Sequence, residues 1–279
     1  RETGLFDWLF HHGVRLNRNM VLDAQCAPIM LGTGPMGDHR NMQMFNWYFS
    51  PVVLSEPDAH PICANLDPLL FEFTSTLDLV NVQPERSATI LLKSSPQSLV
   101  YNAPVRVASA VVNLPPEHFE TGNPEGFPLA VLLEGQFDSF YALRLNKELK
   151  EDVAFGFRPS TENGKLLVVG DADFIRNDTR PTEEGLIPLP LGWDRYSQRV
   201  IYDNKEWLLN ALSYLLDDAG QISLRSRSIA FRPLDDKRIR GNETTWTVAA
   251  VGLPIALVIG LGLILPAWRR RRWTQNTHS

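Results

Sequence analysis

Short, continuous apolar runs separated by turns dominate most of the chain. The runs at 88–93, 105–112, 129–133 and 165–169 have the length of strands, and they are mostly apolar without a regular alternation of polar residues. Continuous runs of this kind are typical of parallel strands that are covered on both faces. The pattern therefore predicts a layered, mostly parallel sheet.

Helical periodicity flanks this strand-rich region. The apolar residues between 5 and 10 fall at helical spacing, and Gly13 can end that helix. A second helix is predicted after Asp203, with Asn204 as its N-cap. Its apolar stripe consists of Leu208, Ala211, Leu212 and Leu215. Helices that alternate with strands indicate an α/β fold.

A run without any charged residue covers 247–267, near the C-terminus. At 1.5 Å per residue, a helix of this length covers a hydrocarbon core of about 30 Å. Arginines follow the run at once, and a short basic flank favours the cytoplasmic side. The sequence predicts a single transmembrane helix with lipid as a partner; a buried core helix is the alternative. The expected anchor residues are Trp246, Trp268, Arg269, Arg270, Arg271 and Arg272.

The charge balance bears on possible partners. The chain has 27 Lys and Arg against 32 Asp and Glu, for a net charge of −5. Four of the positive charges lie at 269–272, so the remainder is more acidic still. An acidic body repels phosphate backbones, which argues against nucleic acid as a partner.

The predicted organisation has four parts. They are a globular α/β domain at 1–224, a stalk at 225–245, a transmembrane helix at 246–268 and a cytoplasmic tail at 269–279. The first residue is Arg1 and no signal peptide opens the chain, so we expect a fragment of a longer protein.

The segment GDADFIRND holds three carboxylates: Asp171, Asp173 and Asp178. At the end of a parallel strand, they could bind a divalent cation or orient a polar ligand. Alternatively, Asp171 and Asp173 cap a turn and the next helix. Trp193 and Tyr196 are candidates for stacking on a sugar, or else belong to the core or an interface. These five residues are the candidate ligand-binding positions.

Other motifs point away from cofactors, metals and catalysis. Gly32, Gly34 and Gly37 form a literal GxGxxG, but Pro35 lies inside it and no amphipathic helix follows, which favours a loop. The histidines are scattered without HExxH or zinc spacing, and GxSxG is missing. We therefore expect no cofactor, no metal and no enzymatic activity.

The two cysteines, Cys26 and Cys63, are too few for a disulfide scaffold. A single bridge and two separate buried thiols are both compatible with the sequence.

Several stretches, in order along almost the whole chain, resemble a known family. They include LFDWLFHHGVRLNRNMVLDAQCAPI, HPICANLDPLLFEFTSTLD, ILLKSSPQS, LAVLLEGQFDSFY, VVGDADFIRND, PLPLGWDRY and NKEWLLNALSYLLDD. The chain resembles the C-terminal half of GldG, the gliding-motility-associated ABC transporter component described as a substrate-binding or auxiliary protein. The block from GDADFIRND to LLNALSYLLDD is the most specific part of the match.

The resemblance implies an accessory domain with a fold like class I glutamine amidotransferases but without their catalytic residues. It also implies anchoring in the bacterial inner membrane with the domain in the periplasm. The implied partners are an ABC permease and an ATPase, in a complex linked to gliding motility or secretion. The family's N-terminal anchor and earlier domain have no counterpart in this sequence.

Three functions compete at this point. The first is an accessory component of an ABC transporter that acts through protein contacts. The second is a periplasmic module that binds a sugar or a peptide through the acidic and aromatic candidates. The third is a hydrolase or amidotransferase that uses Cys26 or Cys63 as its nucleophile.

Overall fold

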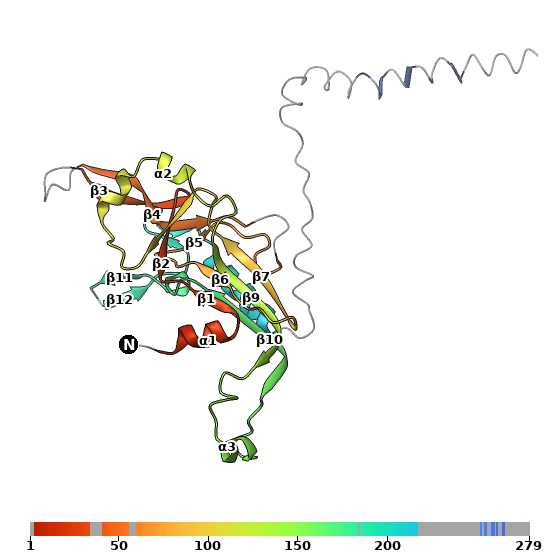
Figure 1. Ribbon diagram of the computed structural model, residues 1–279. Coiled ribbons are helices and arrows are strands. Elements are labelled where there is room, and N and C mark those ends of the chain that lie inside the picture. The colour runs from red at the N-terminus through yellow and green to blue at the C-terminus, as the bar shows by residue number, and fades with distance from the viewer. Residues whose placement is uncertain are drawn as a thin grey trace, which may run out of the picture. The chain divides into compact units, whose positions relative to one another are not determined.

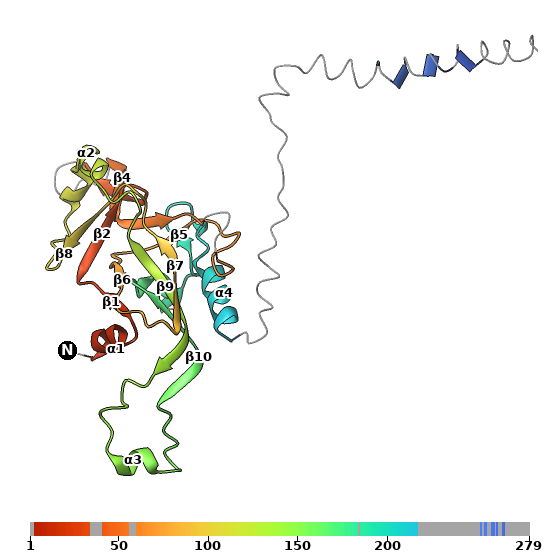
Figure 2. The ribbon, with the colours of Figure 1, turned by 45° about the vertical axis from the view of Figure 1, so that its right-hand side comes forward.

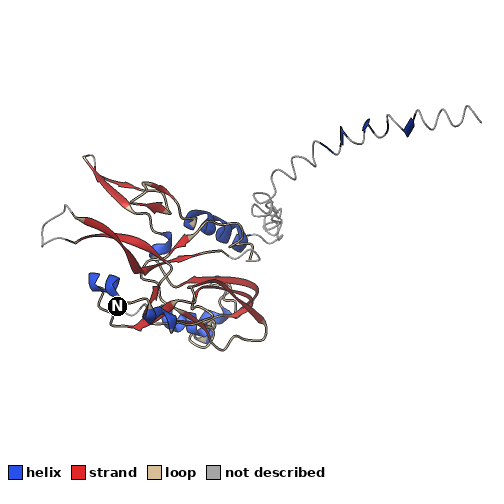
Figure 3. Cartoon of the chain, turned by 90° about the horizontal axis from the view of Figure 1, so that it is seen from above, coloured by secondary structure: helices blue, strands red, loops and turns tan. Residues whose placement is uncertain are grey.

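The computed structural model describes residues 3–33, 41–55, 60–183 and 185–216, together with separate helical positions between 252 and 265. The chain divides into two compact units, 1–228 and 229–279. Strands form most of the regular structure in the first unit (Figure 1 and Figure 3).

The central sheet of the first unit has three strands in the order β10-β9-β7. They are β7 (Arg86–Lys93), β9 (Pro128–Asp138) and β10 (Ser160–Val169). β9 is antiparallel to both neighbours, with Val131 opposite Ile90 on one side and Val168 on the other. All the other strand pairs among the described residues are antiparallel too. The predicted mostly parallel, amidotransferase-like α/β sheet is therefore wrong.

The reason for this error lies in β9, which is covered on both faces. Ala130 and Leu132 belong to one core cluster, and Val131 and Leu133 belong to another. All four are at most 1% exposed. A continuous apolar run reports burial on both faces, and it says nothing about the direction of neighbouring strands.

A helix contributes to the core cluster on each face of the sheet. The helix α4 (Asn204–Leu216) contributes Trp207 and Ala211 to the cluster of Ala130 and Leu132. The helix α1 (Leu5–His11) contributes Leu9 to the other cluster. Figure 2 shows α1 and α4 on opposite sides of the sheet that contains β9.

The remaining strands form small sheets around this centre. β1 (Val14–Leu16) pairs with β6 (Leu77–Leu79), β2 (Asn19–Asp23) with β8 (Ser98–Asn102), β11 (Thr179–Thr182) with β12 (Gly185–Pro188), and β13 (Trp193–Asp194) with β14 (Arg199–Val200). β4 (Met42–Val53) lies between β3 (Cys26–Gly32) and β5 (Leu69–Leu70). The short helices are α2 (Glu117–Glu120), α3 (Lys147–Glu151) and the 3-10 turns η1 (Ser109–Asn113) and η2 (Asp173–Ile175).

Asn204, the predicted N-cap, fastens the start of α4 to two other segments. Its side-chain oxygen accepts a hydrogen bond from the backbone N–H of Leu70 at 2.9 Å. Its amide nitrogen donates to the backbone oxygens of Leu70 at 2.8 Å and Phe174 at 3.0 Å. One buried amide therefore holds together α4, β5 and η2.

The structure corrects the predicted membrane placement. Within the described part of the chain, no helix is long and apolar enough to cross a membrane. A crossing takes about 20 helical residues, whereas α4 is the longest described helix with 13 residues. The predicted membrane-spanning helix of a single-pass inner-membrane protein is therefore not present among the described residues.

Much of the predicted C-terminal organisation lies outside the described residues. This applies to the stalk at 225–245, the tail at 269–279 and most of the segment 246–268. It also applies to the expected anchor residues, Trp246, Trp268, Arg269, Arg270, Arg271 and Arg272.

We expect Asn204→Ala to lower the free energy of unfolding by about 2–3 kcal/mol, because three backbone groups in buried or partly buried positions lose their partner. Urea denaturation of the variant measures this change. Lys205→Ala is the control, since Lys205 is exposed on the same helical turn. Equal stability of the two variants would contradict the role given to Asn204.

A second prediction concerns His12, which is 5% exposed and packs against Trp8 and Phe137. Among the described residues its Nδ1 has no hydrogen-bond partner. Burial, with smaller effects of His11 and Arg86, lowers the pKa of His12 from 6.5 to about 4. The folded protein therefore disfavours protonation, and stability that is complete above pH 6.5 is lost as the pH falls toward 4.

His12→Phe removes this titration and keeps an aromatic ring in place. We expect the variant to lose less free energy of unfolding than the wild type between neutral pH and about pH 4.5. The exposed His118 provides the control variant His118→Gln, which should follow the wild type. If the free energy of unfolding changed equally with pH in all three proteins, the pH dependence would not come from His12.

Candidate functional site

Two adjoining hollows lie where β5 and the segments around η2 and β13 come together. The smaller has a volume of about 40 Å³ and the larger about 270 Å³. Both are lined by Leu70, Glu72, Asp178 and Trp193. We call the larger hollow the aromatic cavity, for the side chains described below.

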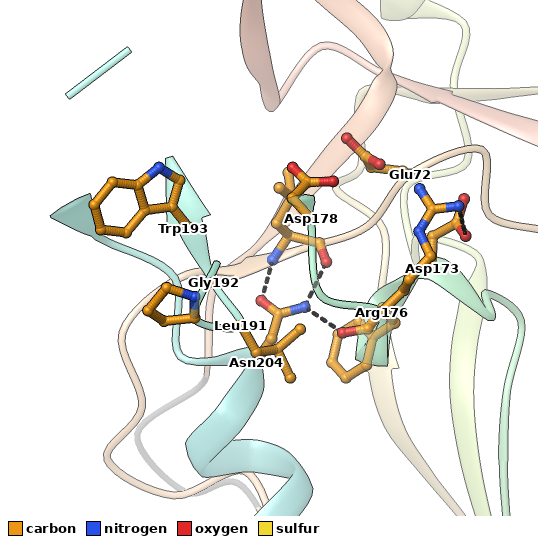
Figure 4. A pocket seen from close by; sticks show the side chains of 11 residues that line it. Glu72, Asp173, Arg176, Asp178, Leu191, Gly192, Trp193 and Asn204 are labelled. Atoms are coloured by element: carbon orange, nitrogen blue, oxygen red, sulfur yellow. Dashed lines mark hydrogen bonds and ion pairs between the residues drawn. The ribbon is translucent and has the colours of Figure 1, made fainter. Parts of the chain in front are cut away.

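The structure brings four of the five candidate residues to these hollows. Asp173, Asp178 and Trp193 line the smaller one, where Figure 4 shows them together with Glu72. Asp178, Trp193 and Tyr196 line the aromatic cavity. Carboxylates from the segment after β10 therefore do lie beside the aromatic side chains of the 193–196 segment.

Asp171 has a different position. One of its carboxylate oxygens accepts the backbone N–H of Glu72 at 2.8 Å, and the other accepts that of Asp173 at 2.7 Å. This arrangement corresponds to the capping alternative. Burial raises the pKa of Asp171, while these two hydrogen bonds lower it in part. Asp171 thus joins the segment after β5 to η2 and lines neither hollow.

Two arginines lie beside the remaining aspartates of this segment. The guanidinium of Arg176 lies 2.9 Å from the carboxylate of Asp173, as Figure 4 shows. The guanidinium of Arg195 lies 3.6 Å from the carboxylate of Asp178. Both pairs are partly exposed to solvent, so each contributes little to stability.

Glu72 is a residue of the site that the sequence did not reveal. It is half-buried, and its side chain faces the same space as Asp178 in Figure 4. No described residue donates a hydrogen bond to its carboxylate or forms an ion pair with it. Burial raises the pKa of Glu72 and the nearby Asp178 raises it further, while the charge of Arg195 lowers it in part. The available signal was a single charged residue between Phe71 and Phe73.

Aromatic side chains form much of the wall of the larger hollow. They are Trp47, Phe73, Trp193, Tyr196 and Tyr202. The hydroxyl of Tyr196 accepts the backbone N–H of Met30 at 2.8 Å, which fixes that ring against β3.

Phe73 has an unusual backbone, with a φ of 53°. A bulky side chain in the left-handed region costs about 1–3 kcal/mol, and such strain is concentrated at functional sites. The hydrogen bond from its N–H to the oxygen of Phe49, at 2.8 Å, holds the residue in this conformation.

The site shows no metal-binding arrangement. Over the residues that the structure describes, no group of three or more His, Cys, Asp or Glu side chains is placed to hold a metal ion. Of the GxGxxG motif, Gly32 ends β3, whereas Gly34 and Gly37 lie outside the described residues.

The cysteines are separate thiols, with Cys63 buried and Cys26 partly buried. The indole N–H of Trp207 donates to Sγ of Cys63 at 3.2 Å. Burial raises the pKa of Cys63 to about 11 and that of Cys26 to about 12. A nucleophilic cysteine needs the opposite shift, because the thiolate is the reactive form.

Comparison with known proteins supplies the family. The model of the family described as "ABC-type uncharacterized transport system" matches residues 1–211, most of the chain. No curated protein and no solved structure matches the chain. The match spans the central sheet, both hollows and the start of α4. The chain therefore belongs to this family of auxiliary proteins of ABC-type transport systems.

Proposed function

We propose that this protein is a non-enzymatic accessory subunit of an ABC transport complex, which acts by binding the transporter's permease or ATPase subunits. Membership of the family supports association with components of an ABC-type transport system. The observation that carries the mode of action is a protruding segment at 139–159, which we call the arm.

The arm connects β9 to β10 and extends away from the central sheet (Figures 1 and 2). The backbone N–H of Ser139 donates to the oxygen of Pro159 at 2.8 Å and closes its base. Asn146 caps α3 by accepting the N–H of Leu149 at 3.0 Å. Local hydrogen bonds thus shape a segment that has few packing partners.

Apolar side chains on the arm are directed to solvent. Leu143 is 98% exposed and Val153 is 93% exposed. Tyr141, Leu149 and Phe155 are exposed as well. Single exposed apolar residues are ordinary, but a concentration on one protruding segment is typical of a protein-binding surface.

The arm has four basic and three acidic residues, so its net charge is small. Lys147 and Glu151 lie 3.7 Å apart on α3, and the guanidinium of Arg144 lies 3.9 Å from the ring centre of Phe140. The exposed apolar side chains add area that a partner can bury. Burial of such area contributes roughly 25 cal/mol per Å².

The proposal also concerns the cellular process in which the transport complex acts. Resemblance to GldG supports gliding motility or secretion, with an ABC permease and ATPase as the partners. The raised pKa values of Cys26 and Cys63 support a role in which neither cysteine acts as a nucleophile.

Charged substitutions in the arm test this function. We expect the double variant Leu143→Asp, Val153→Asp to lose co-purification with ABC permease and ATPase subunits expressed with it, by tenfold or more (about 1.4 kcal/mol). Quantitative mass spectrometry after affinity capture measures the ratio of subunits.

The control is Leu186→Asp, Ile187→Asp on the exposed β12 strand, which adds the same charge to apolar positions elsewhere. Both variants should keep the wild-type melting temperature, because all four positions are exposed. If the arm variant kept the transporter subunits and the control lost them, the contact surface would include β12 instead of the arm. Retention by both would contradict binding through the arm.

A further inference from the structure

The aromatic cavity has features that binding to a transporter does not explain. It has a volume of about 270 Å³ and is lined mainly by β3, β4 and the 193–202 segment. This volume is near the lower end for pockets that hold small ligands. Tyr196 and Phe73 are both held in place by backbone hydrogen bonds, so the walls are preorganised.

Negative charge exceeds positive charge in this cavity. The described residues that line it include the carboxylates of Glu72, Asp178 and Asp194 and a single cation, Arg195. Arg195 is paired with Asp178, and Asp194 accepts the N–H of Ser197 at 2.6 Å. The carboxylate of Glu72 forms no hydrogen bond and no ion pair with a described residue, and the charge of the nearby Arg195 offsets its negative charge only in part. A partly buried, unpaired carboxylate is costly unless a ligand compensates it.

The wall chemistry favours a cation as that ligand. Aromatic faces attract ammonium and guanidinium groups, and tryptophan does so most strongly. Trp193 already takes part in such a contact, because the guanidinium of Arg180 lies 5.8 Å from its ring centre. Aromatic rings beside an unpaired carboxylate are the combination that recognises alkylated ammonium groups.

The same observations distinguish an organic cation from other ligands. A hard metal ion requires several converging oxygen ligands, and the described residues offer no such group. A sugar could stack on Trp193, but its hydroxyl groups would not neutralise Glu72. A positively charged group with an apolar surface satisfies both the carboxylate and the rings.

We propose that the aromatic cavity binds an organic cation, an ammonium or guanidinium group, with Glu72 as its counter-charge and Trp47 and Trp193 as its aromatic walls. The cation can belong to a free small molecule or to a basic side chain of a peptide. This inference goes beyond the accessory role and does not depend on it.

Ligand pairs that differ only in charge provide the first test. Choline is compared with its neutral isostere 3,3-dimethylbutan-1-ol, and a blocked Gly-Arg-Gly peptide with its citrulline counterpart, by calorimetric titration of the full chain. We expect a charged member to bind at least about tenfold more tightly than its neutral partner. Preference for choline identifies a free cation, and preference for the arginine peptide identifies a basic side chain.

Variants of the lining residues provide the second test. Glu72→Gln keeps the shape of the side chain, and we expect it to weaken binding of the charged probe by about tenfold. Trp193→Leu removes an aromatic face and should weaken it by about fivefold. Glu117→Gln is the matched control, since it makes the same change in net charge at an exposed residue of α2 that lines neither hollow.

The results decide the proposal in either direction. Weaker binding by Glu72→Gln and Trp193→Leu, with Glu117→Gln unchanged and far-ultraviolet circular dichroism preserved in all three, supports it. Equal binding of charged and neutral probes would overturn it. So would unchanged affinity in Glu72→Gln, or no binding of either cation at millimolar concentration. Co-purification with transporter subunits is measured separately, so that failure here leaves the accessory role intact.

Discussion

Burial of β9 on both faces is the constraint on which the rest of the first unit depends. Ala130 and Leu132 pack toward the cluster that includes α4, while Val131 and Leu133 pack toward the cluster that includes α1. Because β9 pairs with β7 and β10 along its length, it also fixes the position of the segment after β10. That segment carries Asp173 and Asp178 to the two hollows, and the opposite end of the same hairpin becomes the arm.

The sequence predicted several elements but not how they pair. The apolar runs at 129–133 and 165–169 are strands, and helices do begin near Leu5 and at Asn204. The direction of the strands was predicted wrongly, because a strand buried on both faces has the same apolar pattern in a parallel and in an antiparallel sheet. On α4, Trp207 and Ala211 are buried whereas Leu212 is 46% exposed, since the tertiary packing of β9 decides which side of the helix faces the core.

Some residues of the candidate site could be predicted from the sequence, and others could not. Asp173, Asp178, Trp193 and Tyr196 are near one another in sequence, and their chemistry alone was enough to single them out. Glu72, Trp47 and Tyr202 come from distant segments, so only the fold brings them to the same cavity. Asp171 has the same residue type as its neighbours, yet its hydrogen bonds to the N–H groups of Glu72 and Asp173 give it a structural position.

Hydrogen–deuterium exchange of the chain, alone and with its ABC transporter subunits, tests the central claim that a rigid sheet presents the arm for protein contact. Buried, hydrogen-bonded strands exchange slowly, whereas exposed segments with few packing contacts exchange fast. The account predicts slow exchange in β9 in both samples. It predicts fast exchange at 140–158 in the free protein and protection there once the transporter subunits are added. Unchanged exchange in the arm, with new protection on another surface of the first unit, would contradict it.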